Sequence, residues 1–544
     1  MDIIDYAVQQ ELYQYEEGEI KKQTWTDFDS AVNGKKLFLF GSGEGAAYFF
    51  RKYSDSYLVA GILDNAVQWQ GFAAGDLLAE AFGSVNEEAK IMPVSVLDSY
   101  KKEEVLVLIT STKYYKEMEW QLLDRGITAY YVLLMMEANQ RDQYPEVYEE
   151  VDIKTMMKEY AETCCKKAIQ MNKILFKSFD TYSDHGKYIT EQLLKMSDRL
   201  DIVWILENIQ EEVPRGVRTV WAGNWKKYTY EMETAHIWVM NTLMPTHIIK
   251  RESQIYIQTK HWASITLKKF YLDAATIIDI PEDVARWRHN GRCMDYVLTG
   301  SWFDTESVRR GFDFQKEVVQ IGSPRTDAMF RMRECRRKVI TNCHLKKGNK
   351  MLLYAPTYRY NKDLRGVHKT EARSIGLDYS LIRNALAAKF GGEWDILLRL
   401  HPGVAKESGK FANGEHVVDV SAYPDSEELA SACDIMISDY SSIMFEPAFV
   451  KKPVFLFALD RTDYIDHEYD LLLDYDALPF SVAETNEELV HHIMDFDRTS
   501  YESDLIAFLE RYGVSEDGHA SERAAKFILE LFDRKVQKTE DKTI

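Results

Sequence analysis

The residues best suited to chemistry lie in or just after short apolar runs beyond residue 350 of the 544-residue chain. They are Thr357, Arg359, Arg399, His401, Ser438, Asp439, Ser441, Ser442 and Asp460. Each run reads as a strand of a parallel sheet, and such sheets bind ligands at the carboxyl ends of their strands. We therefore expect a ligand site at this edge. Arg359 and Arg399 are the candidate phosphate clamps, because a guanidinium matches phosphate oxygens bidentately.

The segment Ser438-Asp-Tyr-Ser-Ser442 is the most informative of these pieces, and a helix over about 443–450 is expected to follow it. Serine hydroxyls and free N–H groups at a helix start can bind a phosphate. Glu446, one turn further on, is a candidate for a ribose hydroxyl pair. The alternative interpretations are plain N-capping for the serines and a surface acid for Glu446.

A second candidate group lies in Gln258-Thr-Lys-His-Trp262, which ends another apolar run. His261 could act as a general base, because the pKa of histidine lies near neutrality. The alternative is a structural histidine. The turn Gly322-Ser-Pro-Arg-Thr-Asp327 reads as an elbow between domains, in which Arg325 and Asp327 are expected to pair.

A glycine-rich turn, Gly41-Ser-Gly-Glu-Gly45, follows the first apolar strand. Gly41, Gly43 and Gly45 fit a phosphate-binding turn in part, although position 46, where the third glycine of G-x-G-x-x-G would stand, is Ala. Asp64 follows the next strand, where a ribose-binding acid is expected. The candidate nucleotide site has an alternative, because such a domain can also persist as an interaction module.

The elements that must position these residues alternate between strands and helices along the chain, which indicates an α/β fold with parallel sheets. Strands are predicted at 36–40, 58–63, 105–109, 129–136, 172–176, 202–206, 237–240, 254–258, 296–298, 318–321, 351–354, 396–400, 417–418, 435–437 and 454–457. The predicted units are a Rossmann-like domain over 30–140, a linker and helix over 141–165, an α/β half over 166–330, a basic stretch over 331–350, a second half over 351–533 and a charged tail over 534–544.

Composition excludes several classes. The formal charge of −20, with 46% apolar and 28% charged residues, is that of a globular protein and unlike a nucleic-acid binder. We see no run long enough to span a bilayer, no signal peptide and no metal-ligand cluster. We therefore expect a cytoplasmic protein without a metal, with no partner nucleic acid.

Taken together, these motifs resemble the CDP-glycerol glycerophosphotransferase family of teichoic-acid polymerases and primases. The resemblance covers about residues 165–533. The matching pieces include Asn172–Phe179, Tyr182–Asp184, Ala235–Asn241, Tyr256–His261, Gly322–Asp327, Leu353–Arg359, Arg399–Pro402, Asp434–Ser442 and Lys452–Asp460. Any one piece is weak, but their fixed order is specific.

The resemblance implies a GT-B architecture of two Rossmann-like halves, with an additional Rossmann-like domain in front. It implies transfer of an alditol phosphate, glycerol phosphate foremost, from CDP-glycerol or CDP-ribitol to a hydroxyl of a lipid-linked or glycan acceptor, with release of CMP. His261 then matches the family's favoured base and His401 a histidine near the transferred phosphate. Thr357, Arg359, Asp439, Ser441 and Ser442 match the segments that hold the CDP pyrophosphate, and no cofactor is required.

The sequence departs from the family at the loop of the base. The family has Trp-His-Gly there, whereas this chain has Lys260-His261-Trp262. Lys268 or Lys269 could replace the lysine that follows in the family. Because the loop must differ, a catalytically weak CDP-alditol-binding scaffold is an alternative, as are a glycosyltransferase that uses a nucleotide sugar and an oxidoreductase built on the first domain.

The stretch over 331–350 carries eight basic residues against one acid. Such a patch attracts anionic lipid, so peripheral contact with the inner face of the cell membrane is expected. The alternative is a solvated helix face.

Overall fold

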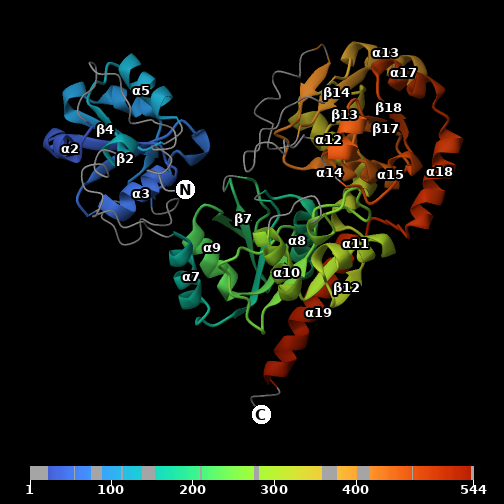
Figure 1. The fold of residues 1–544 in the computed structure, drawn as a ribbon, viewed down its shortest axis with the longest axis horizontal. Coiled ribbons are helices and arrows are strands. Elements are labelled where there is room, and N and C mark those ends of the chain that lie inside the picture. The colour runs from blue at the N-terminus through green and yellow to red at the C-terminus, as the bar shows by residue number, and fades with distance from the viewer. Residues whose placement is uncertain are drawn as a thin grey trace.

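The computed structural model describes residues 23–53, 55–74, 89–111, 114–137, 153–179, 181–208, 211–274, 281–357, 376–400, 414, 416–467 and 470–540. These residues form three parallel sheets, each with helices packed around it (Figure 1). The long apolar runs of the sequence become the buried central strands, which confirms the α/β class.

The N-terminal domain holds a five-stranded sheet in the order β3-β2-β1-β4-β5. Its strands are β1 (Lys36–Phe40), β2 (Val59–Leu63), β3 (Ile91–Met92), β4 (Val105–Ile109) and β5 (Tyr130–Val132), and its helices include α2 (Trp25–Val32), α3 (Glu44–Tyr53) and α5 (Tyr115–Asp124). The predicted strand over 129–136 is wrong in its second part, where residues 133–137 are helical. A short buried apolar run suits either element, and here the helical residues complete the core.

The second unit, called here the N-terminal half, has a seven-stranded sheet in the order β12-β11-β10-β9-β6-β7-β8. Its strands are β6 (Gln170–Lys177), β7 (Asp201–Leu206), β8 (Val217–Trp221), β9 (Ala235–Met240), β10 (Ile255–Gln258), β11 (Tyr296–Thr299) and β12 (Glu317–Gln320). Its helices are α7 (Ile153–Cys164), α8 (Asp184–Met196), α9 (Trp225–Thr234), α10 (Pro281–Cys293) and α11 (Trp302–Phe312), followed by the 3-10 helix η6 (Pro324–Arg331).

The third unit, the C-terminal half, has a six-stranded sheet in the order β15-β14-β13-β16-β17-β18. Its strands are β13 (Lys350–Ala355), β14 (Trp394–Leu398), β15 (Val417–Asp419), β16 (Ile435–Ser438), β17 (Val454–Phe457) and β18 (Ser481–Ala483). Its helices are α12 (Met332–Asn342), α13 (Tyr379–Phe390), α14 (Ser426–Ala432), α15 (Phe445–Phe449), α16 (Arg461–His467), α17 (Asn486–Asp495) and α18 (Arg498–Arg511), with the 3-10 helix η8 (Ser442–Met444) before α15.

The three strands that the sequence failed to predict, β3, β8 and β18, all lie at the edge of a sheet. An edge strand has one neighbour and is often short, so its apolar signal is weak. β3 has two residues and β18 has three.

The last helix, α19 (Ala520–Glu540), returns to the N-terminal half. Its residues Ala524, Ala525, Ile528 and Leu531 join the core around Ile174, and Figure 1 shows it running along that half. Its start is capped by Asp327, which accepts bonds from the amides of Ala520 (3.0 Å) and Ser521 (2.8 Å). The last helix of the segment 351–533, which was expected to belong to the second half, therefore packs on the N-terminal half.

Candidate functional site

His261 follows β10 at the carboxyl edge of the N-terminal half, and its side chain is exposed. The ring of Phe179, which follows the central strand β6, meets the His261 ring edge-on with the centroids 5.2 Å apart. Phe179 is 51% exposed and has a positive φ of 47°. Non-glycine residues in this conformation are strained and gather at functional sites. The imidazole is therefore presented to solvent beside an exposed aromatic ring.

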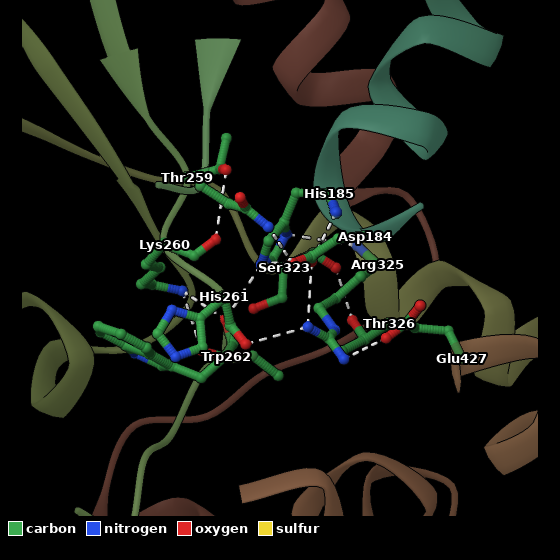
Figure 2. A network of polar contacts seen from close by, with 12 residues as sticks. Asp184, His185, Thr259, Lys260, His261, Trp262, Ser323, Arg325, Thr326 and Glu427 are labelled. Carbon is green, nitrogen blue, oxygen red and sulfur yellow. Dashed lines mark hydrogen bonds and ion pairs between the residues drawn. The ribbon is translucent and has the colours of Figure 1, made fainter. Parts of the chain in front are cut away.

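The two residues that flank His261 point into the protein, as Figure 2 shows. Trp262 is 4% exposed, and its indole N–H donates to Asp304 Oδ1 at 2.9 Å. Lys260 pairs with Asp304 Oδ2 at 3.0 Å, and the two side chains are 1% and 0% exposed. Trp262 thus packs inside the protein, and its ring meets the exposed ring of His261 edge-on with the centroids 5.0 Å apart.

Arg325 connects this loop to the C-terminal half (Figure 2). Its Nη1 donates to Asp184 Oδ1 (3.0 Å) and to the carbonyl of His261 (3.1 Å). Its Nη2 pairs with Glu427 and, at 2.9 Å, with Glu446 Oε1. One guanidinium thereby holds the base loop, the start of α8 and two carboxylates of the opposite half.

Burial and charge set the protonation states in this network. Burial alone would lower the pKa of Arg325, but Asp184, Glu427 and Glu446 together raise it above its usual range. Burial raises the pKa of Asp184, but Arg325, His185 and the hydrogen bond from Asn241 together outweigh it, and the net pKa is lowered. Burial raises the pKa of Glu427 well above its usual range and that of Glu446 to about 7. Burial therefore favours the protonated forms of Glu427 and Glu446, the two acids from the C-terminal half.

His185 is a buried neighbour with a different task. Its Nδ1 accepts from the amide of Arg325 at 3.5 Å, so its Nε2 carries the proton toward the carbonyl of Trp262 at 3.0 Å. Burial lowers the pKa of His185 to about 3. It is a neutral structural histidine, in contrast to the exposed His261.

In the C-terminal half, Thr357 and Asp439 follow β13 and β16, the two strands between which the strand order reverses. The amide and hydroxyl of Thr357 donate to Asp439 Oδ1 at 2.8 and 2.6 Å. The hydroxyl of Ser438 donates to the carbonyl of Ala355 at 2.8 Å. Ligands of open parallel sheets bind at such a reversal, so the structure brings Thr357, Ser438 and Asp439 together where a donor site was predicted.

The helix predicted over 443–450 is present over 442–449, but its first turn is the 3-10 helix η8 and only the five residues of α15 are α-helical. Ser441, just before η8, is half-buried. The hydroxyl of Ser442 accepts from the amide of Leu267 in the N-terminal half at 3.1 Å. Ser442 therefore joins the two halves, and the short helix weakens the case for an anion site built on a helix start alone.

Lys268 and Lys269 lie at the same contact between halves. Lys269 pairs with Asp470 at 3.2 Å, and Lys268 forms an isolated antiparallel bridge with Leu471. The segment after the base loop is thus docked on the C-terminal half.

Arg399 lies just beyond β14, and its Nη1 donates to the carbonyls of Val420 (3.3 Å) and Tyr423 (2.7 Å). Burial lowers its pKa. Part of the predicted phosphate clamp is thus bonded to the backbone. Arg359 and His401, which the sequence also assigned to this site, lie outside the described residues.

The structure corrects two interpretations of side-chain partners. Glu446 is not a surface acid, because it is buried against Arg325 across the boundary between the halves. Its predicted contact with a ribose hydroxyl pair stays a prediction. Arg325 does not pair with Asp327, because Arg325 binds carboxylates from α8, α14 and α15 while Asp327 caps α19. In both cases the actual partners lie on helices that are distant in the sequence.

Comparison with known proteins identifies this arrangement. The model of the CDP-glycerol:poly(glycerophosphate) glycerophosphotransferase family matches residues 159–530. The chain belongs to this family. The match spans both halves and ends inside α19, so the helix that crosses back is part of the family's unit.

Among relatives, the chain is 28% identical over 368 residues to a teichoic acid poly(glycerol phosphate) polymerase of Staphylococcus epidermidis, covering 65% of this chain and 50% of that one. It is 26% identical over 371 residues to a teichoic acid glycerol-phosphate transferase of Staphylococcus aureus, covering 66% and 92%. The chain thus spans about half the length of the first of these relatives and nearly all of the second.

A solved structure of the wall teichoic acid polymerase TagF is similar, with a TM-score of 0.61 and 25% identity over 73% of this chain and 98% of that one. The two halves described above therefore form the GT-B architecture expected for the family. The N-terminal domain precedes the residues that the family model matches.

In the N-terminal domain, the glycine-rich turn is held by contacts with other residues of the same domain. Gly41 has a φ of 108°, and a Cβ on Gly45 would lie 1.8 Å from the carbonyl oxygen of Thr110. These two glycines serve backbone geometry and helix-to-strand packing, whereas Gly43 has open space around it. Asp64 Oδ2 accepts from the amide (2.9 Å) and hydroxyl (2.5 Å) of Ser42.

The other oxygen of Asp64 accepts from the amide of Ala66 at 2.8 Å. Both oxygens of the predicted ribose-binding acid thus have partners within the domain. The predicted nucleotide site stays a prediction, with Gly43 as its one open position.

Sequence reasoning did not find Asp304, His185 or the central place of Arg325. Asp184 carried a signal, because it lies in a polar loop after a central strand. Asp304 carried none, since it sits inside α11 and acts on a loop 42 residues away through Trp262. In the described ranges, no group of three or more His, Cys, Asp or Glu side chains could hold a metal ion.

Proposed function

We propose that the chain transfers an alditol phosphate, glycerol phosphate foremost, from a CDP-alditol to a hydroxyl of a lipid-linked or glycan acceptor, releasing CMP. The reaction serves the synthesis of teichoic acid or a related cell-surface polymer. Membership of the glycerophosphotransferase family carries the proposal, together with the exposed His261 at a strand end. Relatives include both a glycerol-phosphate transferase and a ribitol-phosphate primase, so CDP-glycerol and CDP-ribitol are both candidate donors.

In the proposed reaction, the acceptor oxygen attacks the phosphorus that bears the alditol. The new bond joins that oxygen to phosphorus, and the bond between this phosphorus and the bridging oxygen of the diphosphate breaks. The bridging oxygen leaves with its electron pair on CMP, and the acceptor proton passes to the imidazole of His261. Positioning and charge stabilisation supply most of the rate in such transfers.

The donor is assigned to the carboxyl edge of the C-terminal half. Thr357, Ser438 and Asp439 line the point where the strand order reverses, and Ser441 and Ser442 follow. Arg359, Arg399 and His401 are proposed to face the diphosphate, by their place in the sequence. This arrangement puts the donor on one half and the base on the other.

A CMP-release assay tests the proposal on the full chain with CDP-glycerol, CDP-ribitol and UDP-sugars. We expect CMP from a CDP-alditol and a decrease of about 10²–10⁴-fold in the rate for His261→Gln, the usual contribution of a general base. His491→Gln is the matched control, because the side chain of His491 is 74% exposed on α17. It should keep the wild-type rate.

Other outcomes of the same assay contradict the proposal. Release of UDP from a UDP-sugar would favour the glycosyltransferase alternative. Binding of CDP-glycerol without turnover, unaffected by His261→Gln, would favour the scaffold.

Peripheral membrane contact is a second proposal, and it rests on the basic stretch over 331–350. Arg336 donates to Asp434 and to the carbonyl of Ala432, both at 2.9 Å, and Lys338 pairs with Glu428 at 2.9 Å. These cations hold α12 against α14. Four others are exposed and available to anionic lipid: Arg333, Arg337, Lys346 and Lys347.

Sedimentation with phosphatidylcholine vesicles that contain phosphatidylglycerol tests this contact. Reversing the four exposed charges to Glu should abolish binding at low salt, because each basic residue contributes about 1 kcal/mol near an anionic surface. Binding that survives the reversal would contradict the proposal. No helix in the described part of the chain is both long and apolar enough to cross a membrane.

A further inference from the structure

The backbone of the base loop is turned so that consecutive carbonyl groups point inward. The carbonyl of His261 accepts from Arg325 Nη1 at 3.1 Å. The carbonyl of Trp262 accepts from His185 Nε2 at 3.0 Å. Because the peptide oxygen of His261 faces the buried guanidinium while its side chain is exposed, the inward bonds help to fix the direction of the imidazole.

Lys260 completes this set of donors. Its Nζ donates to the carbonyls of Trp262 (3.0 Å) and Ala263 (2.9 Å) and pairs with Asp304 Oδ2 at 3.0 Å. The ammonium has three protons, and these three acceptors use all of them. The carboxylate of Asp304 is held in turn by the amide of Gly300 at 3.0 Å and the indole of Trp262 at 2.9 Å.

The backbone of Lys260 is itself strained. Its φ is 56°, a conformation that costs a non-glycine residue about 1–3 kcal/mol and persists only where surrounding contacts enforce it. Its amide donates to Gln258 Oε1 at 2.8 Å, and its side chain folds back over the loop. The strain and the ammonium contacts therefore fix the backbone on both sides of His261.

We propose that Lys260, held by Asp304, is a positioning residue that aims His261 for proton transfer. The two positions at which this sequence departs from the family pattern, 260 and 262, are the two whose side chains contact Asp304. The two residues that differ from the family pattern therefore also help to hold the loop, through their contacts with Asp304. The test of this inference by CMP release rests on the proposed function, whereas its test by the NMR signal of His261 does not.

Lys260→Met removes the donors while keeping a side chain of similar length. We expect kcat for CMP release to fall about 10²-fold, the effect of misplacing a reacting group by about 1 Å, with KM for CDP-glycerol within about twofold of wild type. The single variant also leaves Asp304 buried without its cation, which destabilises the fold. Its loss of activity alone would not separate positioning from stability.

The double variant Lys260→Met/Asp304→Asn makes that separation. With both charges removed, the melting temperature should recover most of what the single variant loses, while kcat stays low. The matched control is Lys173→Met/Glu231→Gln, which neutralises another buried ion pair of the same half, 2.6 Å long with side chains 1% and 6% exposed. The control should keep wild-type kcat.

The proposal is overturned if kcat recovers together with the melting temperature in the double variant. It is also overturned if the control loses kcat to the same extent, because both results mean that the pair acts through stability.

A second readout does not depend on turnover. In protein labelled with ¹³C at histidine Cε1, the His261 signal is assigned by its loss in His261→Gln. We expect this signal to move or broaden in the double variant and to stay unchanged in the control. If the wild type releases no CMP from any CDP-alditol, the proposed function fails, and this spectrum still decides the positioning. An unchanged His261 signal in the double variant refutes it.

Discussion

Two loops of this chain follow parallel strands near the centre of their sheets, and they use their polar groups in opposite ways. In the N-terminal domain, Asp64 follows β2 and accepts bonds from Ser42, in the turn after β1, and from Ala66. In the N-terminal half, the loop around His261 is held by Arg325 from η6, by His185 from α8 and by its own Lys260. The first loop is held by residues after β2 and β4 of its own domain, whereas the second is held from α8 and η6 and leaves the side chain of His261 exposed.

The contrast shows why position at a strand end is a weak guide to function on its own. Both loops satisfied that criterion in the sequence, and a glycine-rich turn is the more familiar signal. What distinguishes them is whether a titratable group is left exposed once the backbone has been supported. The side chain of His261 is exposed, whereas Asp64 is half-buried with both of its oxygens bonded.

Among the substitutions that test this contrast, Arg325→Met should cause the largest loss of stability. It leaves the carboxylates of Asp184, Glu427 and Glu446 without their cation, and removing one partner from a buried ion pair destabilises by about 3–5 kcal/mol. Urea unfolding of the full chain measures the loss. Arg325→Lys, which keeps the charge, should lose less.

If Arg325→Met and Arg325→Lys were equally stable, the ion network would not be what holds the base loop to the C-terminal half.

Glu446→Gln tests the same network through pH. Burial raises the pKa of the Glu446 carboxyl to about 7 from its usual 4.5, so the folded chain binds this proton more tightly than the unfolded chain does. Stability from this group is complete below pH 4.5 and is lost as the pH rises toward 7. The groups that influence it are Arg325, Asp184, Asp425 and Glu516.

Relative to Glu446→Gln, the wild type should therefore lose about 1 kcal/mol per pH unit across that interval. Thermal unfolding of both proteins between pH 4 and 8 measures it. Parallel stability curves would mean that Glu446 titrates as an ordinary carboxyl.

Asp64→Ala should have the smallest effect and acts on the other loop. It removes an acceptor from two amides and a hydroxyl in a half-buried turn, which destabilises the N-terminal domain by about 1–2 kcal/mol. Hydrogen exchange at β1 and β2 reports the loss, and Asp64→Asn, which keeps one acceptor, should lose less.

Nucleotide titration of the same variants tests whether Asp64 binds a ligand or only holds the turn. Binding of NAD or another nucleotide that is lost in Asp64→Ala, with no loss of stability, would return Asp64 to a ribose-binding role.

The sequence predicted the strands and the polar strand ends well, because long apolar runs and breaks between them are local signals. It did not predict partners that the fold brings from far away. Asp327 caps a helix 193 residues later, and Arg325 meets Asp184 across 141 residues. Glu446 looked like an exposed helix residue because nothing local shows that α15 turns its acid toward the other half. Edge strands such as β18 were not predicted for a different reason, because three residues are too few to show a periodic pattern.

The return of α19 has a mechanical consequence. The chain passes between the halves twice, once through η6 into α12 and once between α18 and α19. The two passages touch, because Glu516 accepts from Thr326 (2.9 Å) and from the amide of Ser323 (3.2 Å). Because these two connections adjoin, we expect any movement of the halves to be a rotation about the line through Glu516 and η6. We also expect a single cut of the chain between α12 and β13 to leave the halves associated, since α19 stays packed on the N-terminal half.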